Sequence, residues 1–280
     1  MNLDSYRAES LATWAEMAPG WEGRREWLMG ISAPVNDWLL GAVDPQEGES
    51  VLELAAGTGD LGFAIAERVG PDGRVISSDF APEMVDVARR VGAERELGNV
   101  RYEVIDAERI DLPDDHVDAV VCRWGYMLMS DPAAALAETR RVLKPGGRLA
   151  FAVWTAADRN PWAALPAMTL IQAGHMELPE PGTPGILALA DPDRIRELLH
   201  GAGFDEPALE EVGFTFRHPN FADQWATLRE LTGPLARIID ALSESEREAV
   251  RTKLEAAAEP FRTADGGYAI PASSWGVLAR

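Results

Sequence analysis

The chain has 280 residues, of which 46% are hydrophobic and 26% are charged, a composition that predicts a globular protein with a substantial buried core. The formal net charge of −20 repels phosphate backbones and anionic membrane surfaces, which argues against nucleic acid as a partner. The single cysteine, Cys122, excludes an intramolecular disulfide and a cysteine-rich metal site, and we expect no bound metal.

The sequence predicts a cytoplasmic protein without a membrane span. Its first residues, MNLDSYRAESLATWAEM, mix charged and apolar side chains and lack the apolar core of a signal peptide. No apolar run approaches the length that crosses a bilayer. A chain with one cysteine also suits a reducing compartment.

The first half of the chain predicts a helical segment followed by alternating strands and helices. Residues 1–45 are expected to form two or three helices, interrupted at Pro19-Gly20. The apolar runs expected to be strands are 51–55, 74–78, 100–105, 118–122 and 148–154. The helices expected between them are 61–69, 82–91 and 132–143. This alternation predicts a parallel sheet with helices on both faces.

Beyond residue 155, two helical insertions interrupt the alternation, at about 157–188 and 221–262. The first is apolar and rich in methionine, and a proline-rich loop follows it. In the second, Ser243 and Glu246 have the spacing of a capping box. The other elements expected here are a helix over 191–202, a strand over 208–217 and an extended segment at the end of the chain.

A glycine motif lies between the first strand and the helix after it. The run GTGDLG at 57–62 is a literal G-x-G-x-x-G, and its backbone N–H groups would surround a ligand. Asp79 ends the next strand, 20 residues after Gly59, where a dinucleotide-binding protein has the carboxylate that binds ribose hydroxyls. These features alone predict NAD(P), and the alternative is a glycine turn that serves only close packing.

Two acidic sites argue against a dinucleotide. Glu53 lies in the strand before the glycine loop, where its carboxylate would repel a pyrophosphate and would suit an ammonium group. The run Asp106-Ala107-Glu108 places further carboxylates at the end of a third strand. Carboxylates at three successive strand ends form a groove for a ligand with an amine, a ribose and a base but no phosphate. S-adenosylmethionine (SAM) carries these groups.

Four motifs, in order, carry a family resemblance: VLELAAGTGD, VISSDFAPEMVDVAR, IDAERIDLPDDHVDAVVCRWGYM and RVLKPGGRLAFAVW. They resemble the class I SAM-dependent methyltransferases, and more narrowly the branch with the ubiquinone/menaquinone-biosynthesis C-methyltransferases, over about residues 50–155. The resemblance implies an α/β, Rossmann-like fold: a seven-stranded, mostly parallel sheet with helices on both faces, an N-terminal helical segment and two helical insertions. Ala55 departs from the family's usual acidic-x-G-x-G-x-G run, because it replaces the first glycine.

The resemblance also implies how the chain is divided. Residues 1–280 would form a single methyltransferase domain with its SAM-binding core at 46–156. Residues 1–45 would be a helical lid, and the insertions at 157–188 and 221–262 would be helical lids over the substrate.

The family's cofactor-binding roles pass to matching positions of this sequence. Glu53 would face the methionyl amino group, directly or through water. Asp79 would bind both ribose hydroxyls, and Asp106 would accept a hydrogen bond from the adenine amino group. The other residues expected to bind SAM are Ala55, Ala56, Gly57, Thr58, Gly59, Phe80, Met84, Ala107, Glu108, Arg123, Trp14 and Trp21. The alternatives are helix packing for the two tryptophans and an ordinary ion pair for Arg123.

The residues expected to bind the substrate follow the fourth strand or lie in the first insertion. They are Trp124, Tyr126, Trp162, Met168 and His175. Methionine-rich surfaces adapt to varied apolar ligands, although core packing is the alternative for Trp162 and Met168.

Methyl transfer from a sulfonium is an in-line displacement that needs alignment and exclusion of water, and a general base only for a poor nucleophile. None of the four histidines, His116, His175, His200 and His218, is well placed for that role, so no catalytic residue is assigned.

The favoured hypothesis is therefore a SAM-dependent methyltransferase that releases S-adenosylhomocysteine and acts on the carbon or oxygen of a small, largely apolar or aromatic acceptor. The alternatives are a SAM-binding module or pericyclase- or decarboxylase-like enzyme without methyl transfer, and an NAD(P) oxidoreductase. The sequence leaves open the acceptor and whether the protein is a monomer or a homodimer.

Overall fold

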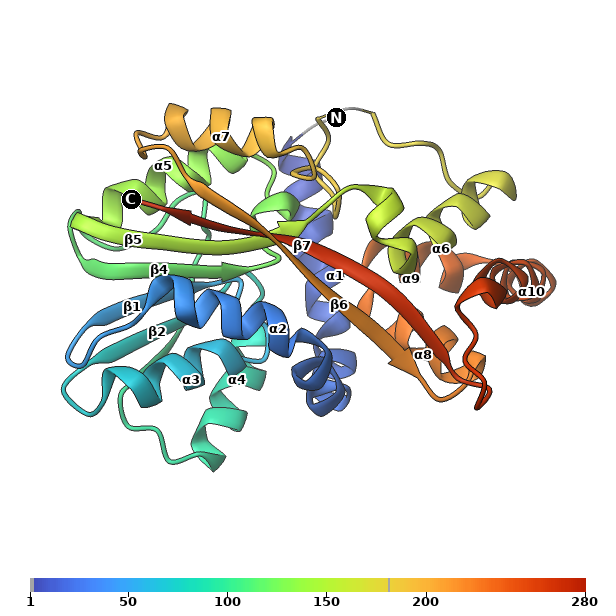
Figure 1. The fold of residues 1–280 in the computed structure, drawn as a ribbon, viewed down its shortest axis with the longest axis horizontal. Helices are drawn as coiled ribbons and strands as arrows, with labels where there is room; N and C mark the ends of the chain where they lie inside the picture. Colours follow the sequence, from blue (N-terminus) through green and yellow to red (C-terminus); the bar gives the residue numbers. More distant parts are fainter. Residues whose placement is uncertain (1–2, 181) are drawn as a thin grey trace.

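The computed structural model describes residues 3–180 and 182–280. These residues contain one seven-stranded sheet and the helices that pack on it (Figure 1). The strands are β1 (Ser50–Leu54), β2 (Arg74–Asp79), β3 (Val100–Val104), β4 (Val117–Arg123), β5 (Leu143–Trp154), β6 (Ala208–His218) and β7 (Tyr268–Ala279). Their order is β3-β2-β1-β4-β5-β7-β6, and only β7 runs antiparallel to its neighbours. The Rossmann-like fold predicted from the sequence is thereby confirmed.

Helices cover both faces of this sheet. The helices are α1 (Leu3–Gly23), α2 (Arg25–Val43), α3 (Asp60–Val69), α4 (Pro82–Glu94), α5 (Pro132–Val142), α6 (Pro161–Gln172), α7 (Pro192–Gly201), α8 (Phe221–Leu231), α9 (Pro234–Ala241) and α10 (Glu244–Ala258), with short 3-10 turns η1 (Tyr126–Leu128), η2 (Ala157–Arg159) and η3 (Glu259–Phe261). The crossovers through α3 and α4 run in one direction along the sheet and the crossover through α5 runs in the other, so right-handed connections place them on opposite faces. Helix α2 packs beside α3, and α7 packs on α5.

The sequence predicts most of these elements because the central strands are mostly apolar. The side chains of β4 and β5 that face the helices are fully buried, as expected for parallel strands covered on both sides. The predicted caps are also present: Asp191 accepts a hydrogen bond from the Asp193 N–H, and Ser243 and Glu246 form the capping box.

One local prediction is wrong. Helix α1 does not stop at Pro19-Gly20 but continues to Gly23. Gly20 lies so close to the backbone of α8 that an added Cβ would be 2.4 Å from the Glu230 carbonyl oxygen. Tertiary packing of α1 on α8 therefore holds the helix together across a proline that would break an isolated helix.

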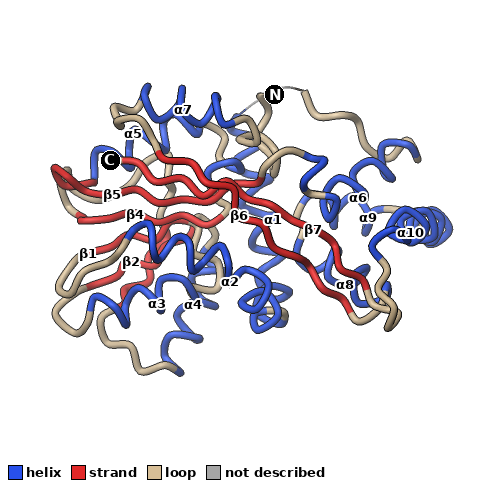
Figure 2. The backbone as a smooth tube through the Cα atoms, in the orientation of Figure 1, coloured by secondary structure: helices blue, strands red, loops and turns tan. Residues whose placement is uncertain are grey.

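The two insertions gather around one projecting part of the sheet. Strand β7 pairs with β5 only from Ser274 onward, whereas its first half pairs with β6 alone, which permits Pro271 inside it. Figure 2 shows α6 and α8–α10 around this two-stranded ribbon. Helix α6 of the first insertion contacts α10 of the second, so segments far apart in the sequence lie side by side.

The order of the strands fixes where a ligand site forms. The chain moves outward from β1 through β2 to β3 and, in the opposite direction, from β4 to β5, so β1 and β4 flank the point where the direction changes. In open α/β sheets, crevices form at the carboxyl ends of the strands at such a point. The loops after β1, β2, β3 and β4 meet there.

Gly276 tests the packing of α2 on the sheet. A Cβ at this position of β7 would lie 2.6 Å from the Trp38 ring of α2, so we expect Gly276→Ala to lower the free energy of unfolding by about 1–3 kcal/mol. Gly213 of the adjacent strand β6 has no atom within 4 Å of its would-be Cβ. The control Gly213→Ala should stay within about 0.5 kcal/mol of wild type in urea unfolding. Equal effects of the two substitutions would contradict this account of the interface.

Candidate functional site

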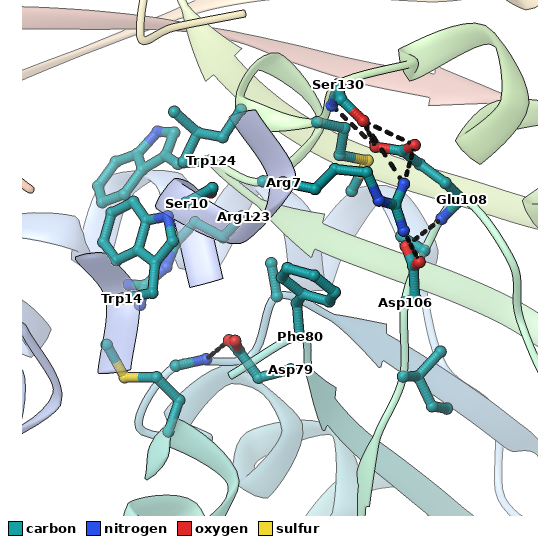
Figure 3. A pocket seen from close by; sticks show the side chains of 18 of the residues that line it. Arg7, Ser10, Trp14, Asp79, Phe80, Asp106, Glu108, Arg123, Trp124 and Ser130 are labelled. Atoms are coloured by element: carbon teal, nitrogen blue, oxygen red, sulfur yellow. Dashed lines mark hydrogen bonds and ion pairs between the residues drawn. The ribbon is translucent and has the colours of Figure 1, made fainter. Parts of the chain in front are cut away.

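A pocket opens at the carboxyl ends of the first four strands, beneath α1 (Figure 3). Helix α1 covers it, the glycine loop and the ends of β2 and β3 form one side, and the stretch after β4 forms the other. The residues that line it are Tyr6, Arg7, Ser10, Trp14, Trp21, Ala55, Gly57, Asp79, Phe80, Met84, Ile105, Asp106, Ala107, Glu108, Arg123, Trp124, Gly125, Leu128, Met129 and Ser130. Predicted residues that follow β1, β2 and β3, such as Gly57 and Asp79, thus lie in the same pocket as Arg123 and Trp124, which end or follow β4.

Asp79 sits at the end of β2 with its carboxylate held by backbone groups. One oxygen accepts a hydrogen bond from the Gly57 N–H at 2.9 Å and the other from the Ala81 N–H at 3.0 Å. Burial raises the pKa of Asp79 above its usual value, although these backbone hydrogen bonds act in the opposite direction. The carboxylate therefore has a fixed position and lines the pocket beside the glycine loop.

The loop after β1 approaches the pocket with an unusual backbone. Gly57 has φ 56° and Ala55 has φ 51°, both in the left-handed region. For Ala55 this conformation costs about 1–2 kcal/mol relative to a glycine, which explains why glycine is common at this position of the motif. Residues held in such conformations mark places where the surrounding structure dictates the backbone.

Across the pocket, Trp124 also has a left-handed backbone, with φ 60°. Its indole N–H donates to the Ser274 hydroxyl at 2.9 Å, and its ring stacks on Trp154 with centroids 4.4 Å apart. Beyond Trp154 lie Trp162 and Phe216, in an aromatic cluster that continues to the first insertion. The wall formed by Trp124 is therefore rigid and apolar.

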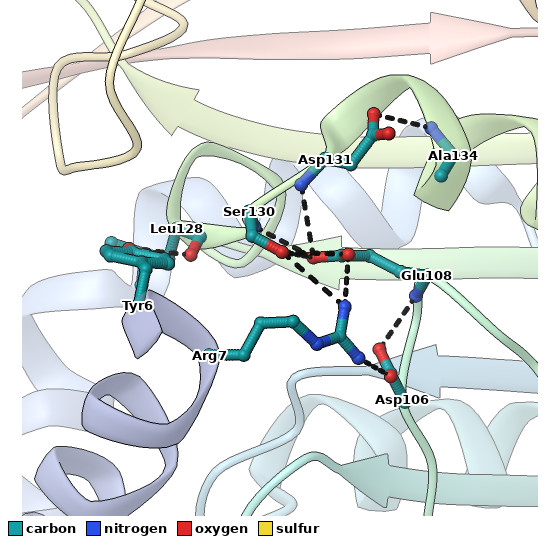
Figure 4. Close-up of polar contacts among 8 residues, drawn as sticks. All are labelled: Tyr6, Arg7, Asp106, Glu108, Leu128, Ser130, Asp131 and Ala134. Atoms are coloured by element: carbon teal, nitrogen blue, oxygen red, sulfur yellow. Dashed lines mark hydrogen bonds and ion pairs between the residues drawn. The ribbon is translucent and has the colours of Figure 1, made fainter. Parts of the chain in front are cut away.

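Acidic groups and Arg7 occupy one end of the pocket (Figure 4). Arg7 of α1 forms ion pairs with both Asp106 and Glu108. The Ser130 hydroxyl and N–H also donate to Glu108, at 2.7 and 2.8 Å. The Arg7 guanidinium lies 5.8 Å from the centroid of the Phe80 ring. This network ties α1 over the pocket and occupies the Asp106 carboxylate.

The opposite end holds Arg123, whose guanidinium nitrogen Nη1 donates to the Ser32 hydroxyl at 2.6 Å and to the Asn36 side-chain oxygen at 3.2 Å. Its guanidinium carbon lies 5.1 Å from the centroid of the Trp124 ring. Burial lowers the pKa of Arg123, and the charges of Glu53 and Asp60 oppose that effect. No carboxylate of residues 3–180 or 182–280 lies within ion-pair distance of this guanidinium.

Two tryptophans of α1 contribute to the same pocket, as the sequence predicts. The rings of Trp14 and Trp21 meet edge to face, with centroids 5.9 Å apart. Trp21 lies against the glycine loop, since a Cβ on Gly57 would be 3.6 Å from its ring. Its buried indole N–H has no hydrogen-bond acceptor among the residues that the structure describes.

Glu53 does not line the pocket, contrary to the position that the sequence analysis gives it. Its carboxylate is buried on the other side of the loop, where it accepts hydrogen bonds from the Gly62 N–H at 3.0 Å and the Ser77 hydroxyl at 2.9 Å. A Cβ on Gly62 would lie 2.3 Å from a Glu53 oxygen. Glu53 therefore supports the loop from behind, and burial raises its pKa to about 7.

Three other residues of the glycine motif lie behind the pocket wall rather than in it. They are Ala56, Thr58 and Gly59. The Thr58 hydroxyl donates to Asp60 at 2.8 Å, and Asp60 in turn pairs with Arg25 of α2. Gly59, with φ 81°, is the N-cap of α3 and faces Phe63.

Of the expected substrate residues, Trp124 lines the pocket, whereas four others do not. Tyr126 points into the core, where its hydroxyl lies 2.6 Å from that of Thr139. Met168 is 46% exposed on α6. Trp162 belongs to the aromatic cluster behind Trp124, and His175 lies near Glu246 of α10, where hydrogen bonds from Ser243 and the charge of His175 lower the pKa of Glu246.

Sequence reasoning missed several pocket residues, chiefly Tyr6, Arg7 and Ser10 of α1 and Leu128, Met129 and Ser130 after β4. The sequence did contain a signal for the residues of α1. Arg7, Ser10 and Trp14 are spaced by three and four, which places them on one face of a helix. Nothing in the sequence indicated which acidic groups Arg7 would reach.

The described lining contains no histidine, lysine or cysteine. It does contain Tyr6, whose pKa is raised to about 12, mainly by burial and to a smaller extent by the charge of Glu108. In the described part of the chain, no three His, Cys, Asp or Glu side chains cluster as a metal site would require. No described helix is both long and apolar enough to cross a membrane.

Residues 51–147 match the family model of a methyltransferase domain. The chain is 34% identical over 167 residues to the demethylmenaquinone methyltransferase of Deinococcus radiodurans, covering 55% of this chain and 67% of that protein. It is 31% identical over 170 residues to a ubiquinone/menaquinone biosynthesis C-methyltransferase of Francisella philomiragia, covering 57% and 68%. A crystal structure of a putative methyltransferase from Bacillus halodurans has the same fold, with a TM-score of 0.58 at 20% identity over 88% of this chain and 97% of that one.

The buried Glu53 carboxyl predicts a pH-dependent stability. Because its pKa rises to about 7 on folding, the folded protein binds more protons than the unfolded chain between the usual glutamic acid value and pH 7. Stability therefore falls as pH rises through this window. In Glu53→Gln the amide oxygen can accept from the Gly62 N–H and the amide nitrogen can donate to the Ser77 hydroxyl. Relative to this variant, the free energy of unfolding of the wild type should fall by about 2–4 kcal/mol between pH 4.5 and 8.

Urea unfolding at a series of pH values measures this difference. Glu67→Gln, at an exposed position of α3, reports the effect of removing one surface charge. A wild-type curve parallel to that of Glu53→Gln across this range would show that the carboxyl is not buried as described.

Proposed function

Because this chain belongs to the class I SAM-dependent methyltransferases, we propose that it moves the methyl group of SAM to a ring carbon or oxygen of a small aromatic acceptor. The observation that carries the proposal is one pocket with two chemically different ends (Figure 3). Asp106 and Glu108 make one end acidic, Asp79 lies beside the glycine loop, and tryptophan rings with apolar side chains form the other end. A cofactor whose adenine and ribose donate hydrogen bonds suits the carboxylates, and an aromatic molecule suits the tryptophan rings.

We place the cofactor along the carboxyl ends of β1, β2 and β3. The fixed carboxylate of Asp79 would accept hydrogen bonds from the ribose hydroxyls. Phe80, Met84 and Ala107 would offer apolar surface for the adenine. The methionine part would pass over Ala55 and Gly57 toward Trp14 and Trp21, whose faces attract a sulfonium. Ala56, Thr58, Gly59 and the buried Glu53 would hold the loop in shape rather than contact the cofactor.

SAM and Arg7 compete for the same carboxylate in this arrangement. Asp106 would accept the adenine amino group, yet Arg7 already donates to it. Adenine entry would leave Arg7 paired with Glu108 alone, which keeps α1 in place over the cofactor. Residues 1–45 would thus act as a lid on a SAM-binding core at 46–156.

The acceptor would lie against Trp124, beside Gly125, Leu128 and Met129. Residues 157–188 and 221–262 would enclose that side less directly, since Trp162 supports the Trp124 wall through Trp154. The proteins named above as relatives methylate quinone precursors by their printed names, which favours a hydroquinone-like ring. The reaction would need the acceptor and the methyl carbon in line and water excluded, which rigid aromatic walls supply.

The proposal is tested by incubating the protein with SAM and 1,4-naphthohydroquinone under reducing conditions. We expect S-adenosylhomocysteine to form in equal amount with a methylated ring. SAM binding without S-adenosylhomocysteine across a panel of hydroquinones and phenols would contradict an aromatic acceptor. Calorimetric binding of NADH without binding of SAM would contradict the cofactor.

Asp79→Asn tests the ribose position. The amide cannot accept hydrogen bonds at both of its terminal atoms, and hydrogen bonds to a charged group contribute about 1.5–3 kcal/mol, so SAM affinity should fall by about ten- to a hundredfold. Asp86→Asn removes an exposed carboxylate of the adjacent helix α4 and should leave the affinity unchanged in calorimetry. Equal affinities of wild type and Asp79→Asn would place the ribose elsewhere.

A further inference from the structure

We propose that Arg123 binds the methyl acceptor as an anion, and that the acceptor is a phenol- or enol-type molecule that reacts in its ionised form. The inference rests on the proposed function and deepens it, since it names the chemical class of the acceptor and the residue that selects it. It follows from where the charges of the pocket lie.

Arg123 is a half-buried cation that forms no ion pair within the described chain, although the charges of Glu53 and Asp60 act on it from beyond ion-pair distance. Both of its hydrogen bonds come from Nη1 and go to the neutral side chains of Ser32 and Asn36 on α2. These two residues orient the guanidinium without neutralising it. A cation in a partly dry site without an ion-pair partner is costly, and an anionic ligand in contact with it would lower that cost.

The position of Arg123 decides which kind of anion it meets. It lies beside the face of Trp124, at the apolar end of the pocket, whereas Asp106 and Glu108 lie with Arg7 at the other end (Figure 3). An aromatic wall with a single guanidinium fits an aromatic ring that carries a negative oxygen, because the ring packs on the indole and the oxygen accepts from the guanidinium.

The cofactor strengthens the case for an anion. A sulfonium in the same pocket would repel Arg123 unless negative charge lay between the two cations. A phenolate or enolate placed there is attracted by both. It is also the nucleophilic form of an otherwise poor nucleophile, and the described lining offers no histidine, lysine or cysteine to remove its proton.

The transfer step balances with these groups alone. The acceptor hydroxyl loses its proton to water as the anion binds to Arg123. An electron pair of the acceptor oxygen or ring carbon then forms a bond to the methyl carbon as the carbon–sulfur bond breaks, and that bond pair stays on sulfur. The sulfonium becomes a neutral thioether and the acceptor loses its charge. After attack by carbon, the ring proton leaves to water.

The test uses 4-nitrophenol, which turns yellow on ionisation, with the protein saturated by S-adenosylhomocysteine. A cation in contact with the phenolate oxygen should lower the pKa of the bound probe by about one unit or more relative to the free probe. Arg123→Gln, which can still bond to Ser32, should abolish this shift. Arg123→Lys should keep at least half of it, and Arg101→Gln, at an exposed position of β3, should keep all of it.

The outcomes separate this inference from the proposed function. An equal shift in wild type and Arg123→Gln, a folded Arg123→Lys without any shift, or no saturable colour change with wild type would each overturn the role of Arg123. A tenfold loss of SAM affinity in Arg123→Gln with the probe shift intact would assign Arg123 to the cofactor's carboxylate instead. Absence of SAM binding and of S-adenosylhomocysteine formation in the wild type would refute the proposed function itself.

Discussion

A single buried carboxylate holds the edge of the sheet where the pocket opens. Glu53 of β1 accepts hydrogen bonds from the Gly62 N–H of α3 and the Ser77 hydroxyl of β2, so one side chain joins three elements. The contact requires a glycine at position 62, because any side chain there would meet the carboxylate. With α3 fixed in this way, the loop between Ala55 and Gly59 is held with its backbone facing the pocket.

The pocket is electrically divided although the whole molecule is strongly acidic. Asp106 and Glu108 lie at one end, where they pair with Arg7, and Arg123 lies at the other end beside Trp124. Local geometry rather than net charge therefore decides what binds. In the proposed arrangement the hydrogen-bond donors of the cofactor's adenine fit toward the first end, and negative charge on the acceptor fits toward the second.

Much of the fold was predictable because its signals are local. Apolar strands, glycine turns and caps such as Asp191 each leave a pattern within a few residues, and the alternation of strands with helices indicated a mostly parallel sheet. The strand-end carboxylates Asp79 and Asp106 were predictable for the same reason, since parallel strands bring their carboxyl ends to one edge. Helix α1 was harder, because its continuity through Pro19 depends on packing against α8.

The orientation of side chains was not predictable in this way. Glu53 and Tyr126 stand at the positions that the motifs require, yet Glu53 turns behind the loop and Tyr126 turns into the core. Glu53 lies inside β1, where side chains on both faces are buried, and Tyr126 lies beyond the end of β4, so period-two alternation signals the direction of neither side chain. Arg7 reaches Asp106 across 99 residues of chain, a contact that depends on the docking of a whole helix.

The two sides of the pocket are also joined mechanically. Ala55 and Trp124 both hold left-handed backbones, and Gly125 fits between them, since a Cβ there would lie 2.7 Å from the Ala55 side chain and 2.6 Å from the Cys122 sulfur. Hydrogen bonding to Ser274 and stacking on Trp154 over-determine Trp124, which is how such strain persists in a folded protein. The Trp124 wall and the loop that begins at Ala55 therefore meet in one close contact at Gly125, where a side chain would force the two segments apart.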